Sequence, residues 1–193
     1  TINNKQQKQN EETMKVKTVL ITAVLSLTAF CLLPAVSSAA TYVVDNIADT
    51  DDLLGYTAAN GTNTLRKCIR LANASTTVAD IINFTGISGT ITLGSLLPAL
   101  TDDAGVTING NTATGYIANT NLTGGFSATT ALTLQIDGAS TYTVGITISS
   151  DNNIINGLNF INIVRVGVDR GVMINLTTGA DNNQILGCYI GTT

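Results

Sequence analysis

The chain has 193 residues, of which 44% are hydrophobic and 11% charged, and it contains no histidine. Disordered chains combine low hydrophobicity with high charge, so this composition predicts a folded protein. Without histidine, these residues cannot form a Ser-His or Cys-His nucleophile pair or a histidine zinc site. From residue 41 onward, eleven aspartates and five basic residues leave a net charge of −6, which disfavours nucleic acid as a partner.

Residues 15–40 have the three parts of a secretory signal peptide. Lys15 and Lys17 precede an uncharged, mostly apolar run over residues 18–33, and small residues follow up to Ala40. We expect cleavage near Ala39 or Ala40, since each has a serine two positions earlier, and therefore a secreted or cell-surface protein.

Two other interpretations of this segment are weaker. The apolar run is shorter than the roughly 20 residues that a transmembrane helix needs. Phe30, which precedes Cys31, is too large for a bacterial lipoprotein signal. We expect Met14 to be the initiator, so that residues 1–13 are upstream sequence, and residues 1–40 together form the processed part.

Residues 41–80 are expected to form an N-terminal cap. Residues 41–44 are β-branched and aromatic, which predicts a short strand, and residues 45–52 supply turn residues. Residues 64–74 predict a helix, because Leu65, Cys68, Ile69 and Ala72 form one apolar stripe. Asn63 or Thr64 can cap the start of this helix, and we expect its basic side chains to face water. These side chains are Arg66, Lys67 and Arg70.

The same segment resembles a known motif. Residues 63–69 read Asn-Thr-Leu-Arg-Lys-Cys-Ile, and Ala-Asn-Ala follows at 72–74. This stretch is similar to the Cys-Ser-Leu-Arg-Glu-Ala-Ile motif near the start of many exported bacterial β-helix proteins. Asn63, Lys67 and Cys68 depart from that motif. The resemblance implies a capping segment rather than an active site.

Residues 81–193 contain short strand-like runs separated by Gly, Asn and Asp. Residues 151–158 and 181–188 align at an offset of 30 residues, which indicates a solenoid. The alignment pairs Ile155 with Ile185 at a core position and Ile154 with Gln184 at an exposed one. It also pairs two further sets of residues that we expect to be buried, Leu158 with Cys188 and Phe160 with Ile190. Stacked asparagines in the Asp-Asn-Asn turns are expected to bond from coil to coil.

Residues 150–158 and 183–192 resemble the repeats of the pectate-lyase-like superfamily. The expected fold class is all-β: a right-handed, single-stranded parallel β-helix with an N-terminal cap containing one short helix. The coils occupy residues 81–193 and are expected to continue beyond residue 193. An antiparallel β-sandwich is the alternative, although hairpin signals are scarce.

Three groups of charged residues are candidate sites. Asp45, Asp49, Asp51 and Asp52 could bind calcium, but their spacing lacks the pattern of a calcium loop, so a solvated turn is preferred. Asp102 and Asp103 could act as acid and base only in a turn, because adjacent strand residues point to opposite faces. Arg165 and Arg170, near Asp169, could contact a sugar acid, but a coil corner is preferred.

No residue is assigned a catalytic, cofactor-binding or metal-binding role, and no cofactor is expected. Cys68 and Cys188 are expected to be buried thiols, not a disulfide, since both occupy apolar positions far apart.

The function that we expect is that of a structural or adhesin-like protein outside the cell, whose partners are extracellular polysaccharide or host and cell-surface ligands. A membrane would be reached only through an anchor outside these residues. The alternative is a polysaccharide lyase or glycoside hydrolase whose catalytic coils lie beyond residue 193.

Overall fold

The computed structural model describes residues 3–15, 17, 38–50, 61–75, 77–121, 125, 127, 130–164 and 171–192. The chain forms two compact units, Thr1–Ser37 and Ser38–Thr193. In the first unit, residues 3–15 are helical and exposed, and the predicted apolar run lies outside the described residues. Among the residues that are described, no helix has the length and apolar character needed to cross a membrane.

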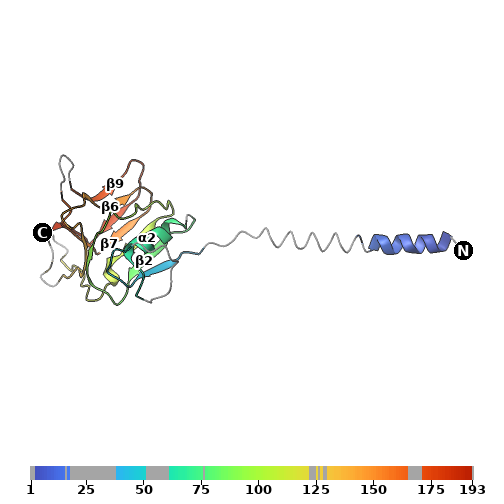
Figure 1. Cartoon of the computed structure of the whole chain (residues 1–193), viewed down its shortest axis with the longest axis horizontal. Helices are drawn as coiled ribbons and strands as arrows, with labels where there is room; N and C mark the ends of the chain where they lie inside the picture. Colours follow the sequence, from blue (N-terminus) through green and yellow to red (C-terminus); the bar gives the residue numbers. More distant parts are fainter. Residues whose placement is uncertain are drawn as a thin grey trace. The chain divides into compact units, whose positions relative to one another are not determined.

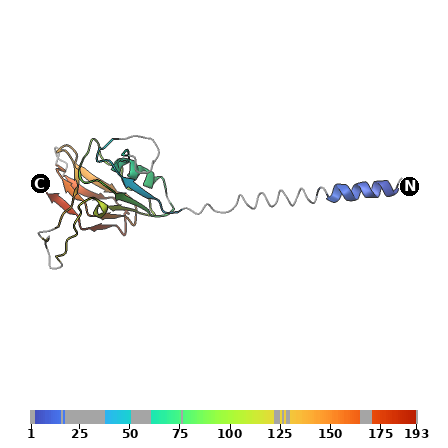
Figure 2. The same cartoon turned by 90° about the horizontal axis from the view of Figure 1, so that it is seen from below.

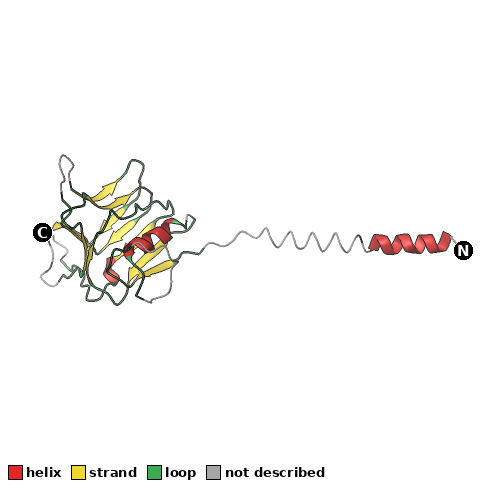
Figure 3. Cartoon of the chain, viewed as in Figure 1, coloured by secondary structure: helices red, strands yellow, loops and turns green. Residues whose placement is uncertain are grey.

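The second unit is built mainly of β-strands arranged in three sheets, and all pairs between its named strands are parallel (Figures 1 and 3). The first sheet has the order β1 (Thr41–Val44), β2 (Asp80–Phe84), β4 (Val106–Asn109), β7 (Ile154–Asn156), β10 (Gln184–Leu186). The second has the order β3 (Gly89–Thr92), β5 (Leu134–Asp137), β8 (Asn159–Ile161), β11 (Tyr189–Thr192). The third pairs β6 (Val144–Ile148) with β9 (Val172–Leu176). The prediction of an all-β fold with parallel strands is therefore confirmed, and an antiparallel sandwich does not fit these pairs.

Successive strands visit the three sheets in a fixed order. Strands β4, β5 and β6 lie in the first, second and third sheet, and β7, β8 and β9 repeat that order. An isolated parallel bridge between Leu100 and Ile148 adds an earlier segment beside the third sheet. Antiparallel pairing among the described residues is confined to the bridge between Ile117 and Ala131, in the segment that follows the 3₁₀ turn η1 (Gly110–Thr112).

The register confirms the 30-residue alignment. Ile155 pairs with Ile185 and Phe160 with Ile190. Inward side chains form continuous stacks, because alternate residues of a strand point to the same face. The stack of the first sheet is Ile82, Ile108, Ile155 and Ile185, and that of the second is Ile91, Ile136, Phe160 and Ile190.

The last members of both stacks are less buried than predicted. Ile185 is only half-buried, and Ile190 is 53% exposed. Strands β10 and β11 stand at the ends of their sheets and pair on one side only, so nothing among the described residues covers their inward side chains from the other side.

The helix α2 (Leu65–Asn73) confirms the predicted helix, and it lies against β1 and β2 (Figures 1 and 2). Thr64 is its N-cap, with the side-chain oxygen accepting a hydrogen bond from the Lys67 N–H at 3.2 Å. The whole predicted apolar stripe is buried. The prediction for the basic side chains was wrong in two cases, because Arg66 and Lys67 are each 3% exposed, and only Arg70 faces solvent.

Candidate functional site

Two buried carboxyl groups lie where β2 begins and in the turn that precedes β4. Asp80 is the first residue of β2 and shares the inward face with Ile82 and Phe84. Asp102 closes a turn by accepting the Gly105 N–H on its carbonyl oxygen at 2.9 Å, and the Gly105 carbonyl in turn accepts the Asp80 N–H at 3.0 Å. Both aspartates are fully buried. We call Asp80 and Asp102 the buried carboxyl pair.

Each of these carboxyl groups is only half satisfied. Asp80 Oδ1 accepts the backbone N–H of Ala40 at 2.7 Å, and Asp102 Oδ1 accepts the N–H of Ala104 at 3.0 Å. The Oδ2 atoms of both aspartates are buried without a hydrogen-bond partner. Burial raises the pKa of Asp102, and the neighbouring charges of Asp80 and Asp103 add to that rise, while the Ala104 N–H opposes it. The pair therefore has capacity for a proton or a cationic group.

The structure separates Asp102 from Asp103. Asp102 is buried and Asp103 is exposed, so the two side chains do not meet at one surface as an acid and a base would have to. The second buried carboxyl group at this corner is Asp80, which sequence reasoning did not single out. Its signal was its place two residues before Ile82 and four before Phe84, on the inward face of a period-two strand.

A column of asparagines continues from this corner along the first sheet. Asn153 Oδ1 accepts the Val106 N–H at 2.9 Å, and Asn183 Oδ1 accepts the Asn153 N–H at 2.8 Å. Asn153 Nδ2 also donates to Asn183 Oδ1 at 3.0 Å and to the carbonyl oxygen of Ser150 at 3.0 Å. The predicted bonding between stacked asparagines is therefore confirmed, and these side chains satisfy backbone groups that turns would otherwise leave buried and unpaired.

The outer face of the first sheet carries a second amide row. Asn83, Asn109 and Asn156 are in register on neighbouring strands, and Asn109 Nδ2 donates to Asn83 Oδ1 at 3.1 Å. No charged residue occurs at the outward positions of this sheet, which are Thr41, Val43, Ile81, Asn83, Thr107, Asn109, Ile154, Asn156, Gln184 and Leu186. We call these ten residues the outer face of the first sheet. It offers four amides and two hydroxyls beside four aliphatic side chains, and no fixed charge.

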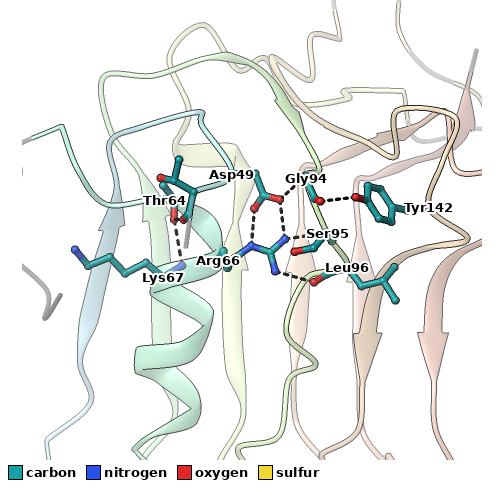
Figure 4. A network of polar contacts seen from close by, with 9 residues as sticks. Asp49, Thr64, Arg66, Lys67, Gly94, Ser95, Leu96 and Tyr142 are labelled. Atoms are coloured by element: carbon teal, nitrogen blue, oxygen red, sulfur yellow. Dashed lines mark hydrogen bonds and ion pairs between the residues drawn. The ribbon is translucent and has the colours of Figure 1, made fainter. Parts of the chain in front are cut away.

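Asp49, which was expected to lie in a solvated turn, instead forms a buried ion pair with Arg66 (Figure 4). Arg66 Nε donates to Asp49 Oδ1 at 2.9 Å and Arg66 Nη2 to Asp49 Oδ2 at 2.6 Å, and the two side chains are 4% and 3% exposed. The guanidinium also donates to the carbonyl oxygens of Ser95 and Leu96, each at 2.7 Å. The pair thus ties the start of α2 to the loop after β3.

The same loop is held from two more sides. Asp49 Oδ2 accepts the Gly94 N–H at 2.8 Å, and the Tyr142 hydroxyl donates to the Gly94 carbonyl oxygen (Figure 4). Asp45 likewise accepts the N–H groups of Asn63 at 2.8 Å and Gly61 at 3.0 Å. Asp45 and Asp49 therefore anchor loops.

Asp51 and Asp52, and the set of Arg165, Asp169 and Arg170, lie outside the described residues. Within the described ranges, no group of three or more acidic or cysteine side chains could hold a metal ion.

Both described cysteines are free thiols. Burial raises the pKa of Cys68 to about 12, with a further rise from the charge of Asp45 that Lys67 partly opposes. Burial also raises the pKa of Cys188, which is half-buried, while backbone hydrogen bonds oppose the rise. Neither thiol is therefore activated as a nucleophile at neutral pH.

No known protein family matches the chain, and no characterised protein matches it either.

Proposed function

We propose that this chain is an exported, non-enzymatic protein of the cell surface or extracellular space, whose second unit is a right-handed parallel β-helix serving as an adhesin-like scaffold. The observation that carries the fold part of this proposal is the order in which successive strands visit the three parallel sheets. A chain that returns to the same sheets in the same order, with parallel pairing, advances by one coil per circuit. Right-handedness follows from the strong preference of parallel crossovers for that hand.

Stacked coils suit a scaffold because each coil needs only its neighbours for stability and repeats its outward side chains at the strand spacing. The outer face of the first sheet is the surface that we assign to ligand contact. Its amides and hydroxyls, without charge, favour an uncharged partner such as a neutral extracellular polysaccharide. The leader-like segment, Lys15 to Ala40, supports export.

Binding to immobilised neutral polysaccharides, measured with the processed full chain, tests this function. We expect Asn109→Asp and Asn156→Asp to weaken binding, because each places a carboxylate in the outer face of the first sheet. Asn121→Asp is the matched control, since Asn121 is exposed but lies outside that face. Equal effects of all three substitutions would contradict the assignment. Release of new reducing ends from the polysaccharide would instead favour the enzyme alternative.

A further inference from the structure

The first residue that the second unit holds by hydrogen bonds is Ala40. Its N–H donates to Asp80 Oδ1 at 2.7 Å, and its carbonyl oxygen accepts the N–H of Ile81 at 2.9 Å. Ser38 and Ala39 are exposed, and the structure gives neither of them a hydrogen bond to another described residue. The boundary between free and anchored chain therefore falls between Ala39 and Ala40.

The buried carboxyl pair at this boundary has no counter-ion among the described residues. The hydrogen bonds that the side chains of Asp80 and Asp102 accept there come from backbone N–H groups, those of Ala40 and Ala104. The buried Arg66 pairs with Asp49. A buried carboxylate without a positive partner is strongly unfavourable. The Oδ2 atom of each aspartate has no hydrogen-bond partner, so each carboxyl group can accept a further donor.

We propose that the leader is cleaved between Ala39 and Ala40, and that the new α-ammonium group of Ala40 becomes the counter-ion of Asp80 in the buried carboxyl pair. This inference rests on the proposed export. The step is a hydrolysis by a signal peptidase: one water is consumed, and the peptide C–N bond breaks. Ala39 keeps the carboxylate, and the nitrogen of Ala40 takes up the protons that make it an ammonium.

Cleavage turns one N–H donor into three on an atom that already lies 2.7 Å from Asp80. The existing hydrogen bond becomes charge-assisted. The added positive charge also acts at the corner that holds Asp102, because Gly105 hydrogen-bonds to the backbone of both aspartates. The uncut chain can offer only the neutral amide at this point.

The alternative cut, after Ala40, fits the structure less well. It would remove the residue whose N–H satisfies Asp80 and whose carbonyl oxygen satisfies Ile81. The new terminus would be on Thr41, one residue further along β1. Both cuts leave small residues at the end of the leader, Ser37 and Ala39 or Ser38 and Ala40, so the hydrogen bonds of Ala40 decide between them.

The ion pair has a defined pH dependence. An α-amino group has a pKa of about 7.7–8.0 in an unfolded chain. Asp80 and the neighbouring Asp102 and Asp103 would raise this pKa in the folded protein, so the stabilisation is complete below about pH 7.7 and is lost as pH rises through the folded-state pKa.

The first experiment is N-terminal sequencing of protein secreted by bacteria that express the full chain. We expect the sequence to begin at Ala40. A start at Thr41 or at any other residue overturns the assigned cleavage site. Retention of the leader overturns the proposed export together with this site.

The second experiment tests the ion pair separately from export. Residues 38–193 form a compact unit with its own core, so chains that begin at Ser38 and at Ala40 can be compared after removal of a fusion partner. Starting at Ser38 keeps the Ala40 N–H but moves the charge two residues away. We expect the chain beginning at Ala40 to melt about 3–12 °C higher at pH 6, as a charge-assisted hydrogen bond predicts for a chain of this size.

The difference in melting temperature should disappear in Asp80→Asn and persist in Asp103→Asn, an exposed neighbour that serves as the matched control. An equal melting temperature for both starting points, or a difference that survives Asp80→Asn, overturns the ion pair. If Asp80→Asn fails to fold, NMR titration of the Ala40 α-amino group decides. A pKa above about 8 supports the pair, and an ordinary or lower pKa overturns it.

Discussion

The inward stack of the first sheet can be tested by placing the same substitution at two adjacent residues of β7. Ile155 is fully buried, with Ile108 and Ile185 in register on either side. Ile154 points to the opposite face, is half-buried, and lies between Thr107 and Gln184. Changing each isoleucine to threonine keeps the β-branched shape, so the preference for extended backbone is nearly constant between the two variants.

The expected costs differ because only one threonine hydroxyl is buried. At Ile155 the lost methylene costs roughly 0.5–1.5 kcal/mol, and a hydroxyl without a partner in the apolar stack costs about 1–3 kcal/mol more. Ile155→Thr should therefore reduce the free energy of unfolding by about 1.5–4.5 kcal/mol. Ile154→Thr should cost less than about 1 kcal/mol, because the new hydroxyl reaches solvent and the adjacent strand already carries Thr107 there.

Urea denaturation of both variants measures these two costs, provided that the slope of the free energy of unfolding against urea concentration is unchanged. Ile185→Thr provides a third point, with an intermediate loss because Ile185 is only half-buried. Equal losses at Ile154 and Ile155, or a larger loss at Ile154, would show that the inward face of β7 is wrongly assigned.

Three further predictions concern the polar and sulfur groups. Asp49→Asn should lower stability by about 3–5 kcal/mol, because it leaves the buried guanidinium of Arg66 without its carboxylate; thermal melts that show no loss would contradict the ion pair. Asn153→Ala should destabilise by about 1–3 kcal/mol, since it leaves a buried backbone N–H on β4 unpaired, and a neutral result in urea denaturation would count against the asparagine column. Iodoacetamide should label Cys188 before Cys68 in the folded protein, given the pKa of about 12 and full burial of Cys68; mass spectrometry that finds Cys68 labelled first, or a disulfide between the two, would refute this.

The parts of the fold that were predicted from sequence are those whose burial is encoded by periodic apolar residues. The stripe on α2 and the pairing of Ile155 with Ile185 both follow from spacing within a few residues or one repeat. Such patterns report which face is covered without requiring knowledge of what covers it. The helical period of α2 and the period-two pattern of the strands can therefore both be recognised in the sequence.

Contacts between distant residues were not predictable in this way. A helix surface with Arg66 and Lys67 has the charge pattern of an exposed face, and only the placement of Asp49, 17 residues earlier, makes burial of Arg66 favourable. The exposure of Ile190 has a similar origin, since it depends on β11 being at the end of its sheet. Local sequence does not carry either piece of information.

The buried carboxyl pair shows the same limit for polar residues. Asp102 in a turn followed by Asp103 is typical of solvated loops, yet Asp102 is buried in the turn before β4. There Gly105 hydrogen-bonds to the backbone of both Asp102 and Asp80, which lies 22 residues earlier in the chain. A pattern of polar residues does not distinguish between a surface turn and an interior corner, because both need backbone N–H groups to be satisfied.

The energetic effect of Asp102 can be measured directly with Asp102→Asn in the chain that begins at Ser38, where Ala40 has no α-ammonium. Burial raises the folded-state pKa of Asp102 above its ordinary value of 3.8, and the charges of Asp80 and Asp103 raise it further. A raised pKa means that the folded protein binds the proton more tightly, so wild-type stability falls as pH rises from about the unfolded value through the folded one.

Asparagine can still accept the Ala104 N–H but carries no charge to bury. The stability of Asp102→Asn relative to wild type should therefore increase with pH across this window and stay constant above it, while Asp103→Asn, at an exposed position, should show a much smaller change. Urea denaturation between pH 3.5 and pH 7 measures the difference in free energy of unfolding between Asp102→Asn and wild type. If that difference does not vary with pH, Asp102 is not held in the buried, half-satisfied position described.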